Sequence, residues 1–216
     1  LPIDVLLKPL TTCLEHLQKF RVEGTLHPGR GEFPDWSCWP NLAYLSLELA
    51  TVELAHHILA SVPTTQWRGL NLMVLDDDPD REGMFKGLED ADWRLKQVGM
   101  HYVDFVKHAD MLKHFHGLVK LTVKHVPLDS SLWPRLKEVL NPNSHTQLQT
   151  IRCYHEMDST GLENEVEVSK DELAWLLTWP TLIHFTHSNK YLPSWWNRIR
   201  QSKLVDLAAH PLKLTH

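Results

Sequence analysis

The stretch WPNLAYLSLEL at residues 39–49 decides the fold. Its Trp-Pro pair favours the end of one element and the start of another, because proline fixes φ and biases the preceding residue away from helix. After that pair, Leu45 and Leu47 are flanked by Tyr44 and Glu48 and separated by a serine. Successive strand side chains point to opposite faces of a sheet, so the stretch predicts a strand with one buried face.

The spacing of apolar residues in this stretch recurs along the chain. Its frame is an apolar residue, two residues of any type, a second apolar residue, one of any type and a third apolar residue. Copies of the frame lie at Leu17-Phe20-Val22, Leu42-Leu45-Leu47, Trp67-Leu70-Leu72, Met100-Val103-Phe105, Leu118-Leu121-Val123, Leu148-Ile151-Cys153 and Leu204-Leu207-Ala209, and Leu182-Phe185 begins another. The first three copies start 25 residues apart, and the later intervals are 33, 18, 30, 34 and 22 residues. A strand-forming unit therefore repeats, regularly at first and unevenly later.

Helix-like segments lie between the copies of the frame. Residues 51–62, TVELAHHILASV, place their apolar side chains on one stripe, and residues 129–140 carry a proline near the start of a second such segment. Residues 169–177 open with Ser169 and Glu172, the spacing of a capping box. Strands alternating with helices predict an α/β fold with a short-stranded parallel sheet and outer helices, in a single domain over residues 1–216. A non-repeat α/β domain is the alternative fold.

The Trp-Pro frame itself returns as WPRL at residues 133–136 and WPTL at residues 179–182. With the alternation of strands and helices, this pattern resembles the leucine-rich-repeat superfamily in its irregular form, notably the degenerate repeats that follow F-boxes in fungal proteins. The resemblance covers most of the chain and implies a solenoid with helices on its outer side. It also implies a non-enzymatic interaction domain that recognises a protein or peptide on its strand face, for example as the substrate-recognition part of a ubiquitin ligase.

In such a horseshoe, the strand residues between the apolar positions point to the concave face. The sequence places tyrosines, cations and carboxylates there, and tyrosine and arginine are enriched where binding energy concentrates. The predicted partner-binding residues are Tyr44, Glu48, Tyr102, Asp104, Lys120, Lys124, Arg152, Tyr154 and His184. We expect a protein partner at this face, with no cofactor and no metal. An ordinary solvated surface is the alternative, because any sheet with one exposed face alternates in this way.

The acidic stretch DDDPDREGMFKGLE at residues 76–89 supports a different function. Asp78, Asp80, Glu82 and Glu89, with a glycine at the sixth position, nearly match the calcium loop of an EF-hand. A calcium- or metal-dependent sensor or enzyme is therefore the alternative function. An EF-hand loop must follow a helix, however, and the run before Asp76 has the pattern of a strand. We interpret the stretch as an acidic turn in which Asp80 caps a short helix.

Composition narrows the remaining classes of function. The chain of 216 residues has a net charge of −5, which argues against nucleic acid as the main ligand, although Lys120, Lys124 and Arg152 form a basic group. Three cysteines are too few for a disulfide framework, and no apolar run is long enough to span a bilayer. We expect an intracellular protein. Cys153 occupies an apolar position of the frame, which is typical of a buried thiol, and no catalytic motif was found, so we expect no enzyme.

Overall fold

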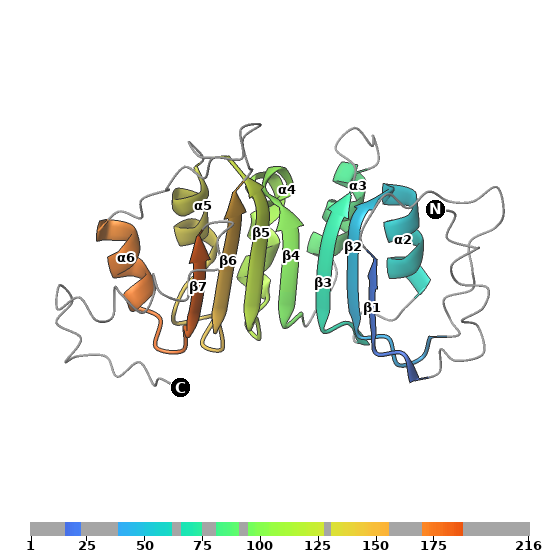
Figure 1. The fold of residues 1–216 in the computed structure, drawn as a ribbon, viewed down its shortest axis with the longest axis horizontal. Coiled ribbons are helices and arrows are strands. Elements are labelled where there is room, and N and C mark those ends of the chain that lie inside the picture. Colours follow the sequence, from blue (N-terminus) through green and yellow to red (C-terminus); the bar gives the residue numbers. More distant parts are fainter. Residues whose placement is uncertain are drawn as a thin grey trace.

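The computed structural model describes residues 16–22, 39–61, 66–74, 81–90, 95–127, 131–155 and 170–187. Seven parallel strands form one sheet, and their order in the sheet is their order in the sequence (Figure 1). The strands are β1 (Lys19–Val22), β2 (Tyr44–Ala50), β3 (Gly69–Val74), β4 (Gln97–His101), β5 (Lys120–Val126), β6 (Thr150–His155) and β7 (His184–His187). The predicted α/β class and the short-stranded parallel sheet are confirmed.

One backbone arrangement joins each strand to the next. The carbonyl oxygen of Gln18, just before β1, accepts hydrogen bonds from two successive amides, Ala43 N and Tyr44 N, both at 3.0 Å. The carbonyls that make the same double contact with the following strand belong to Ala43, Arg68, Lys96, Val119 and Gln149. Each of these residues lies just before its own strand. The strands are therefore aligned at their starts, which satisfies backbone groups that would otherwise be buried without partners.

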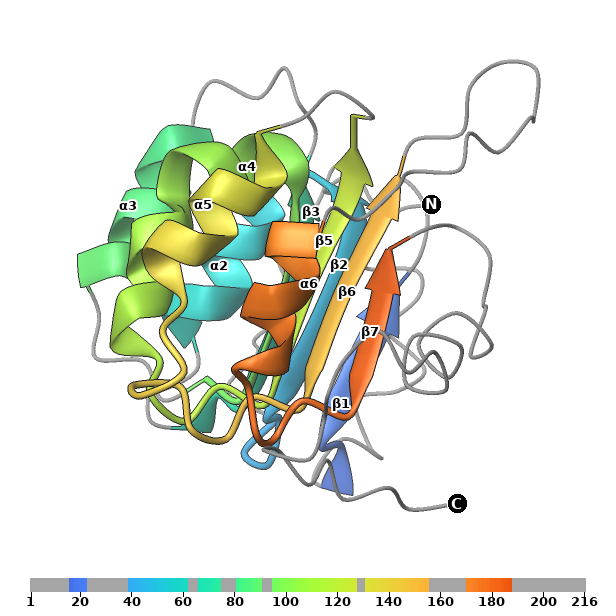
Figure 2. The same ribbon diagram turned by 90° about the vertical axis from the view of Figure 1, so that its left-hand side faces the viewer.

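All the described helices lie on the same face of the sheet (Figure 2). They are α2 (Val52–Ser61), α3 (Arg81–Asp90), α4 (Tyr102–His108), the 3₁₀-helix η5 (Ala109–His114), α5 (Leu132–Val139) and α6 (Lys170–Leu177). The helices predicted within residues 51–62, 129–140 and 169–177 are thus confirmed. Viewed along the sheet, the edge strands β1 and β7 lie farther from the helices than β2 and β6 do (Figure 2). The sheet is therefore concave on the side away from the helices.

The core lies between the sheet and these helices. Leu45, Leu47, Leu121 and Val123, which the frame assigned to the buried face of β2 and β5, are at most 2% exposed. Several strands are preceded by a turn. In this turn, the carbonyl oxygen of an aromatic residue accepts a hydrogen bond from the backbone amide three residues later. The residues in this role are Trp39, Phe115, His145 and Trp179. Because the strands bury their apolar side chains on the face toward the helices, the register of the sheet is fixed.

His145 takes the place of a large aromatic residue in this turn and is only 1% exposed. Its Nε2 lies 2.8 Å from the carbonyl oxygen of Leu112, and its Nδ1 lies 3.1 Å from the amide nitrogen of Asn141. The Leu112 carbonyl can only accept, so Nε2 donates to it, and Nδ1 also lies 3.2 Å from the carbonyl oxygen of Asn141. His145 is therefore a structural residue of the core.

The fourth strand differs from the prediction. The frame at Met100-Val103-Phe105 placed Tyr102 and Asp104 on the strand face, but β4 ends at His101 and both residues belong to α4. The side chain of His101 accepts a hydrogen bond from Val103 N at 3.2 Å, which starts the helix. Asp104 is 1% exposed, and the hydroxyl group of Tyr102 contacts Ser131. Neither residue can belong to a binding surface on the strands.

The copy of the frame that forms β4 is Leu95-Val98-Met100, which the sequence analysis did not use. Val98 pairs with Leu70 and Leu121, and Met100 pairs with Leu72 and Val123, so the three strands share one buried face. The copy at Leu204-Leu207-Ala209 lies outside the described residues.

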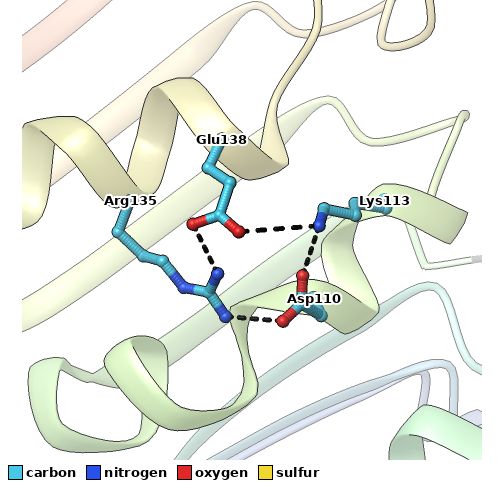
Figure 3. Close-up of polar contacts among 4 residues, drawn as sticks. All are labelled: Asp110, Lys113, Arg135 and Glu138. Carbon is cyan, nitrogen blue, oxygen red and sulfur yellow. Dashed lines mark hydrogen bonds and ion pairs between the residues drawn. The ribbon is translucent and has the colours of Figure 1, made fainter.

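Four charged side chains on the outer side of the helix layer form an ion-pair quartet of Asp110, Lys113, Arg135 and Glu138 (Figure 3). Arg135 contacts a carboxylate oxygen of Asp110 and one of Glu138, each at 2.7 Å. Lys113 lies 2.5 Å from Asp110 and 3.9 Å from Glu138. Hydrogen bonds from Lys113 and Arg135 lower the pKa of Asp110, and those to Glu138 and Asp110 raise the pKa of Arg135. The quartet joins η5 to α5.

Within the described part of the chain, no helix has both the length and the apolar character that crossing a bilayer requires.

Candidate functional site

The face of the sheet opposite the helices, here called the strand face, carries the residues that alternate with the core positions. The pairing of neighbouring strands arranges these residues in rows across the sheet. One row consists of Lys19, Tyr44, Gly69, Gln97, Lys120, Thr150 and His184, and the next of Arg21, Ser46, Asn71, Gly99, Thr122, Arg152 and Thr186. Side chains from segments more than 130 residues apart in the sequence therefore share one surface.

A hollow of about 180 Å³ lies on the strand face and is called the basic hollow below. Its described lining comes from β1 to β6. The lining residues with side chains at this face are Lys19, Arg21, Tyr44, Ser46, Asn71, Gln97, Lys120, Thr122, Lys124, Arg152 and Tyr154, with Gly69 and Gly99 between them. Five of these side chains are cationic, and the described lining contains no aspartate or glutamate.

Two glycines at the centre of the sheet shape the floor of the basic hollow. A Cβ atom at Gly69 would lie 2.7 Å from Cδ1 of Tyr44, so the tyrosine ring lies across the space above this glycine. A Cβ atom at Gly99 would lie 2.8 Å from Cγ of Asn71, whose amide covers Gly99 in the same way. Both glycines allow a close approach of a neighbouring side chain to the backbone, which any other residue would prevent.

Asn71 is the most unusual group of the floor. Its Nδ2 donates a hydrogen bond to Ser46 Oγ at 2.8 Å. Its Oδ1 is buried and has no hydrogen-bond partner among the described residues. An unsatisfied buried acceptor costs free energy, about 1–3 kcal/mol in typical proteins, unless a donor reaches it. The Asn71 amide is thus held between Ser46 and Gly99, with its oxygen packed against the glycine.

The cations of the basic hollow influence one another. Partial burial lowers the pKa of Lys120, and the positive charges of Arg152, Lys19 and Arg21 lower it further. Lys19 and Arg21 lie on β1, four strands away from β5. Four strand spacings in a flat sheet measure roughly 19 Å, so the curvature of the sheet and the length of these side chains bring the charges together. A positive potential therefore concentrates over the floor.

The structure places most of the predicted binding residues in this region. Tyr44, Lys120, Lys124, Arg152 and Tyr154 all line the basic hollow. Glu48 lies on β2, where it pairs with Met73. His184 is exposed on the edge strand β7 and is not among the residues that line the hollow. Tyr102 and Asp104 lie on α4, as described above.

The nine predicted binding residues did not include Lys19, Arg21, Ser46, Asn71 and Thr122, which lie at alternating positions of the same strands. The sequence analysis also missed Gln97, Gly99 and the covering of the glycines by Tyr44 and Asn71. Gln97 and Gly99 were missed because the fourth copy of the frame was placed five residues too late. The spacing of Leu95, Val98 and Met100 carried the signal that could have found them.

The described part of the acidic stretch, from Arg81 onward, is a helix and not an EF-hand loop. Helix α3 begins at Arg81, so Glu82 and Glu89 both lie within a helix, and the preceding element is the strand β3. A calcium loop must instead wrap around the ion over most of its twelve residues. Asp78 and Asp80 lie outside the described residues. In the described ranges, no group of three His, Cys, Asp or Glu side chains could hold a metal ion.

Cys153 faces the core from β6 and is fully buried. Burial raises the pKa of its thiol to about 12. The thiol is therefore protonated at neutral pH, whereas a nucleophilic cysteine must form the thiolate.

Comparisons with protein-family models, with curated proteins and with solved structures found no match to this chain. The function is therefore argued from the geometry and chemistry of the basic hollow.

Proposed function

We propose that this chain is a non-enzymatic interaction domain, an irregular leucine-rich-repeat-like solenoid that binds a protein or peptide on its strand face. Support for the solenoid comes from the strands, which follow one another in sequence order, and from the helices, which cover one side of the sheet. All-parallel sheets usually have both faces covered by helices, so a concave face without a described helix is unusual outside repeat folds.

The observation that carries the binding role is the basic hollow. It is lined by long polar and aromatic side chains on the concave side of a sheet that a core holds in place from behind. Arginine and tyrosine are the residue types that concentrate binding energy at interfaces, and Arg21, Arg152, Tyr44 and Tyr154 supply both here. Their rigid support means that little ordering free energy is lost when a partner binds.

The resemblance to repeats that follow F-boxes suggests a context for this binding. In that context, the domain would present a substrate protein to a ubiquitin ligase through its strand face. The same geometry serves any assembly in which the domain selects one protein, so this part of the proposal rests on the resemblance alone.

Panning a phage-displayed library of random peptides on the full chain tests the proposal. We expect enriched peptides that bind the wild type and lose binding when Tyr44 and Tyr154 are both replaced by alanine. A matched control replaces Val103 and Val106 by alanine, since these residues are 41% and 37% exposed on α4, in the helix layer. Peptides that bind all three proteins equally well would overturn the proposal, provided that circular dichroism shows that each variant is folded.

A further inference from the structure

We infer that the basic hollow binds an acidic segment of the partner protein, with aspartate or glutamate carboxylates placed among its cations. The inference rests on the proposed function, because it names the chemistry of the peptide that the strand face would recognise. Its basis is the sign of the charge, the convergence of the cations, the hydrogen-bonding capacity of the floor and the size of the hollow.

The charge of the basic hollow is opposite to that of the whole chain. The chain carries 27 acidic and 22 basic residues, yet the described lining contributes five cations and no carboxylate. An acidic protein attracts anions at long range only where basic side chains are locally concentrated. The strand face provides such a concentration, and a complementary partner is therefore negatively charged.

The cations also converge instead of following a line. Lys120 on β5 interacts with Arg152 on the neighbouring strand and with Lys19 and Arg21 from the far edge of the sheet. These positive charges disfavour the charged form of Lys120, and a carboxylate placed beside it would favour that form. Convergence distinguishes this surface from a site for single-stranded nucleic acid, where basic and aromatic groups follow a backbone over several nucleotides.

The floor favours a peptide carboxylate over a phosphate group. Phosphate sites commonly use free backbone amides, whereas the backbone amides along these strands pair with the neighbouring strands of the sheet. The lining instead offers side-chain donors beside the cations, among them Gln97 and Thr122.

The volume of the hollow fits a segment better than a cofactor. Pockets for drug-sized ligands usually enclose about 300–1,000 Å³. A hollow of about 180 Å³ accommodates one or two side chains and leaves the rest of a peptide outside it.

The test measures fluorescence polarisation of a labelled peptide of alternating Glu and Gly residues, mixed with the full chain at low ionic strength. We expect this peptide to bind, its Gln-Gly counterpart not to bind, and added NaCl to weaken binding through screening. The double variant Lys120→Gln/Arg152→Gln should bind about tenfold more weakly or worse, since two partly buried charge contacts are lost.

The matched control is Lys107→Gln/Lys137→Gln, which removes two positive charges from exposed positions on α4 and α5. It should bind the Glu-Gly peptide like the wild type. Equal loss in both double variants would show a net-charge effect and would overturn the inference. Lys19→Gln is a single-site test from the opposite edge of the sheet and should also weaken binding of the Glu-Gly peptide.

Two further probes separate the competing ligands. Oligothymidylate, or a peptide with phosphoserine in place of Glu, would overturn the inference if it bound while the Glu-Gly peptide did not. Phage-selected peptides without excess Asp or Glu that still require Tyr44 and Tyr154 would overturn the inference and leave the proposed function intact. Peptides that bind independently of the strand face would overturn both.

Discussion

The helix layer and the strand face of the same sheet hold their charges in opposite ways. In the ion-pair quartet, Lys113 and Arg135 lie within 4 Å of the carboxylates of Asp110 and Glu138, so two positive and two negative charges balance. In the basic hollow, five cations share one concave surface, and the described lining supplies no carboxylate. The first arrangement pairs opposite charges, whereas the second gathers like charges on one surface.

This difference separates charges that stabilise the fold from charges suited to a ligand. The carboxylates of the quartet are about half exposed, and exposed ion pairs contribute at most about 1 kcal/mol each. In the hollow, burial and the positive charges of Arg152, Lys19 and Arg21 instead lower the pKa of Lys120, which disfavours its charged form. A protein tolerates such a cost where function requires it, and the strand face is therefore the surface to test.

The largest contrast between the two faces should appear along β5. We expect Leu121→Ala, which removes a fully buried side chain on the helix side of this strand, to lower the free energy of unfolding by about 2–5 kcal/mol. The neighbouring change Lys120→Gln should leave that free energy unchanged or raise it slightly, since it removes repulsion. Urea denaturation measures both. Similar losses in the two variants would mean that the strand face is packed as tightly as the core.

The next test adds a methyl group to the floor of the hollow. Gly99→Ala should lower the free energy of unfolding by about 1–3 kcal/mol, because Asn71 must move from its position and lose its hydrogen bond to Ser46. Gly83→Ala is the control in the helix layer. It has no atom within 4 Å of the added methyl group and should stabilise α3 by up to about 1 kcal/mol. Thermal melts that gave the two changes the same sign would contradict this account of the floor.

The sequence predicted the strands correctly where only one copy of the apolar frame fitted the local sequence. At Leu42-Leu45-Leu47 and Leu118-Leu121-Val123, the spacing of apolar residues predicted strands where the structure has β2 and β5. Around Met100 two frames overlapped, and the later one was chosen. The choice was wrong because His101 caps a helix, an effect that the apolar spacing does not contain. If the fourth copy starts at Leu95, the intervals before and after it are 28 and 23 residues, which are closer to the first two intervals of 25 residues.

The candidate site was predicted only in part for a related reason. Alternation along one strand is local, so Tyr44, Lys120 and Arg152 could be assigned to a common face. The hollow itself depends on which strands lie side by side and on how Asn71 covers Gly99. Such contacts join segments that are distant in the sequence, and hydrophobic periodicity in a single sequence carries no information about them.

A smaller effect should appear in the ion-pair quartet. We expect a double-mutant cycle of Asp110→Asn and Arg135→Gln to give a coupling free energy of about 0.5–1 kcal/mol, which decreases in 1 M NaCl. The pKa of Asp110 is lowered in the folded state, so its contribution is present above the unfolded value of 3.8 and is lost as the pH falls below it. A coupling that did not respond to salt would mean that the interaction is not mainly electrostatic.

The smallest expected effect is a pH dependence of the free energy of unfolding that arises from Lys120 in the hollow. The pKa of Lys120 is lowered from 10.5, so at alkaline pH below 10.5 the unfolded chain binds more protons than the folded protein. The free energy of unfolding of the wild type should therefore rise relative to that of Lys120→Gln as the pH passes through the folded pKa towards 10.5. Urea titrations of both proteins across this range measure the difference. With saturating Glu-Gly peptide the rise should disappear, because bound carboxylates favour the charged lysine. A difference between the two proteins that stayed constant with pH would mean that Lys120 is not influenced by the other cations, and the contrast with the quartet would lose its electrostatic basis.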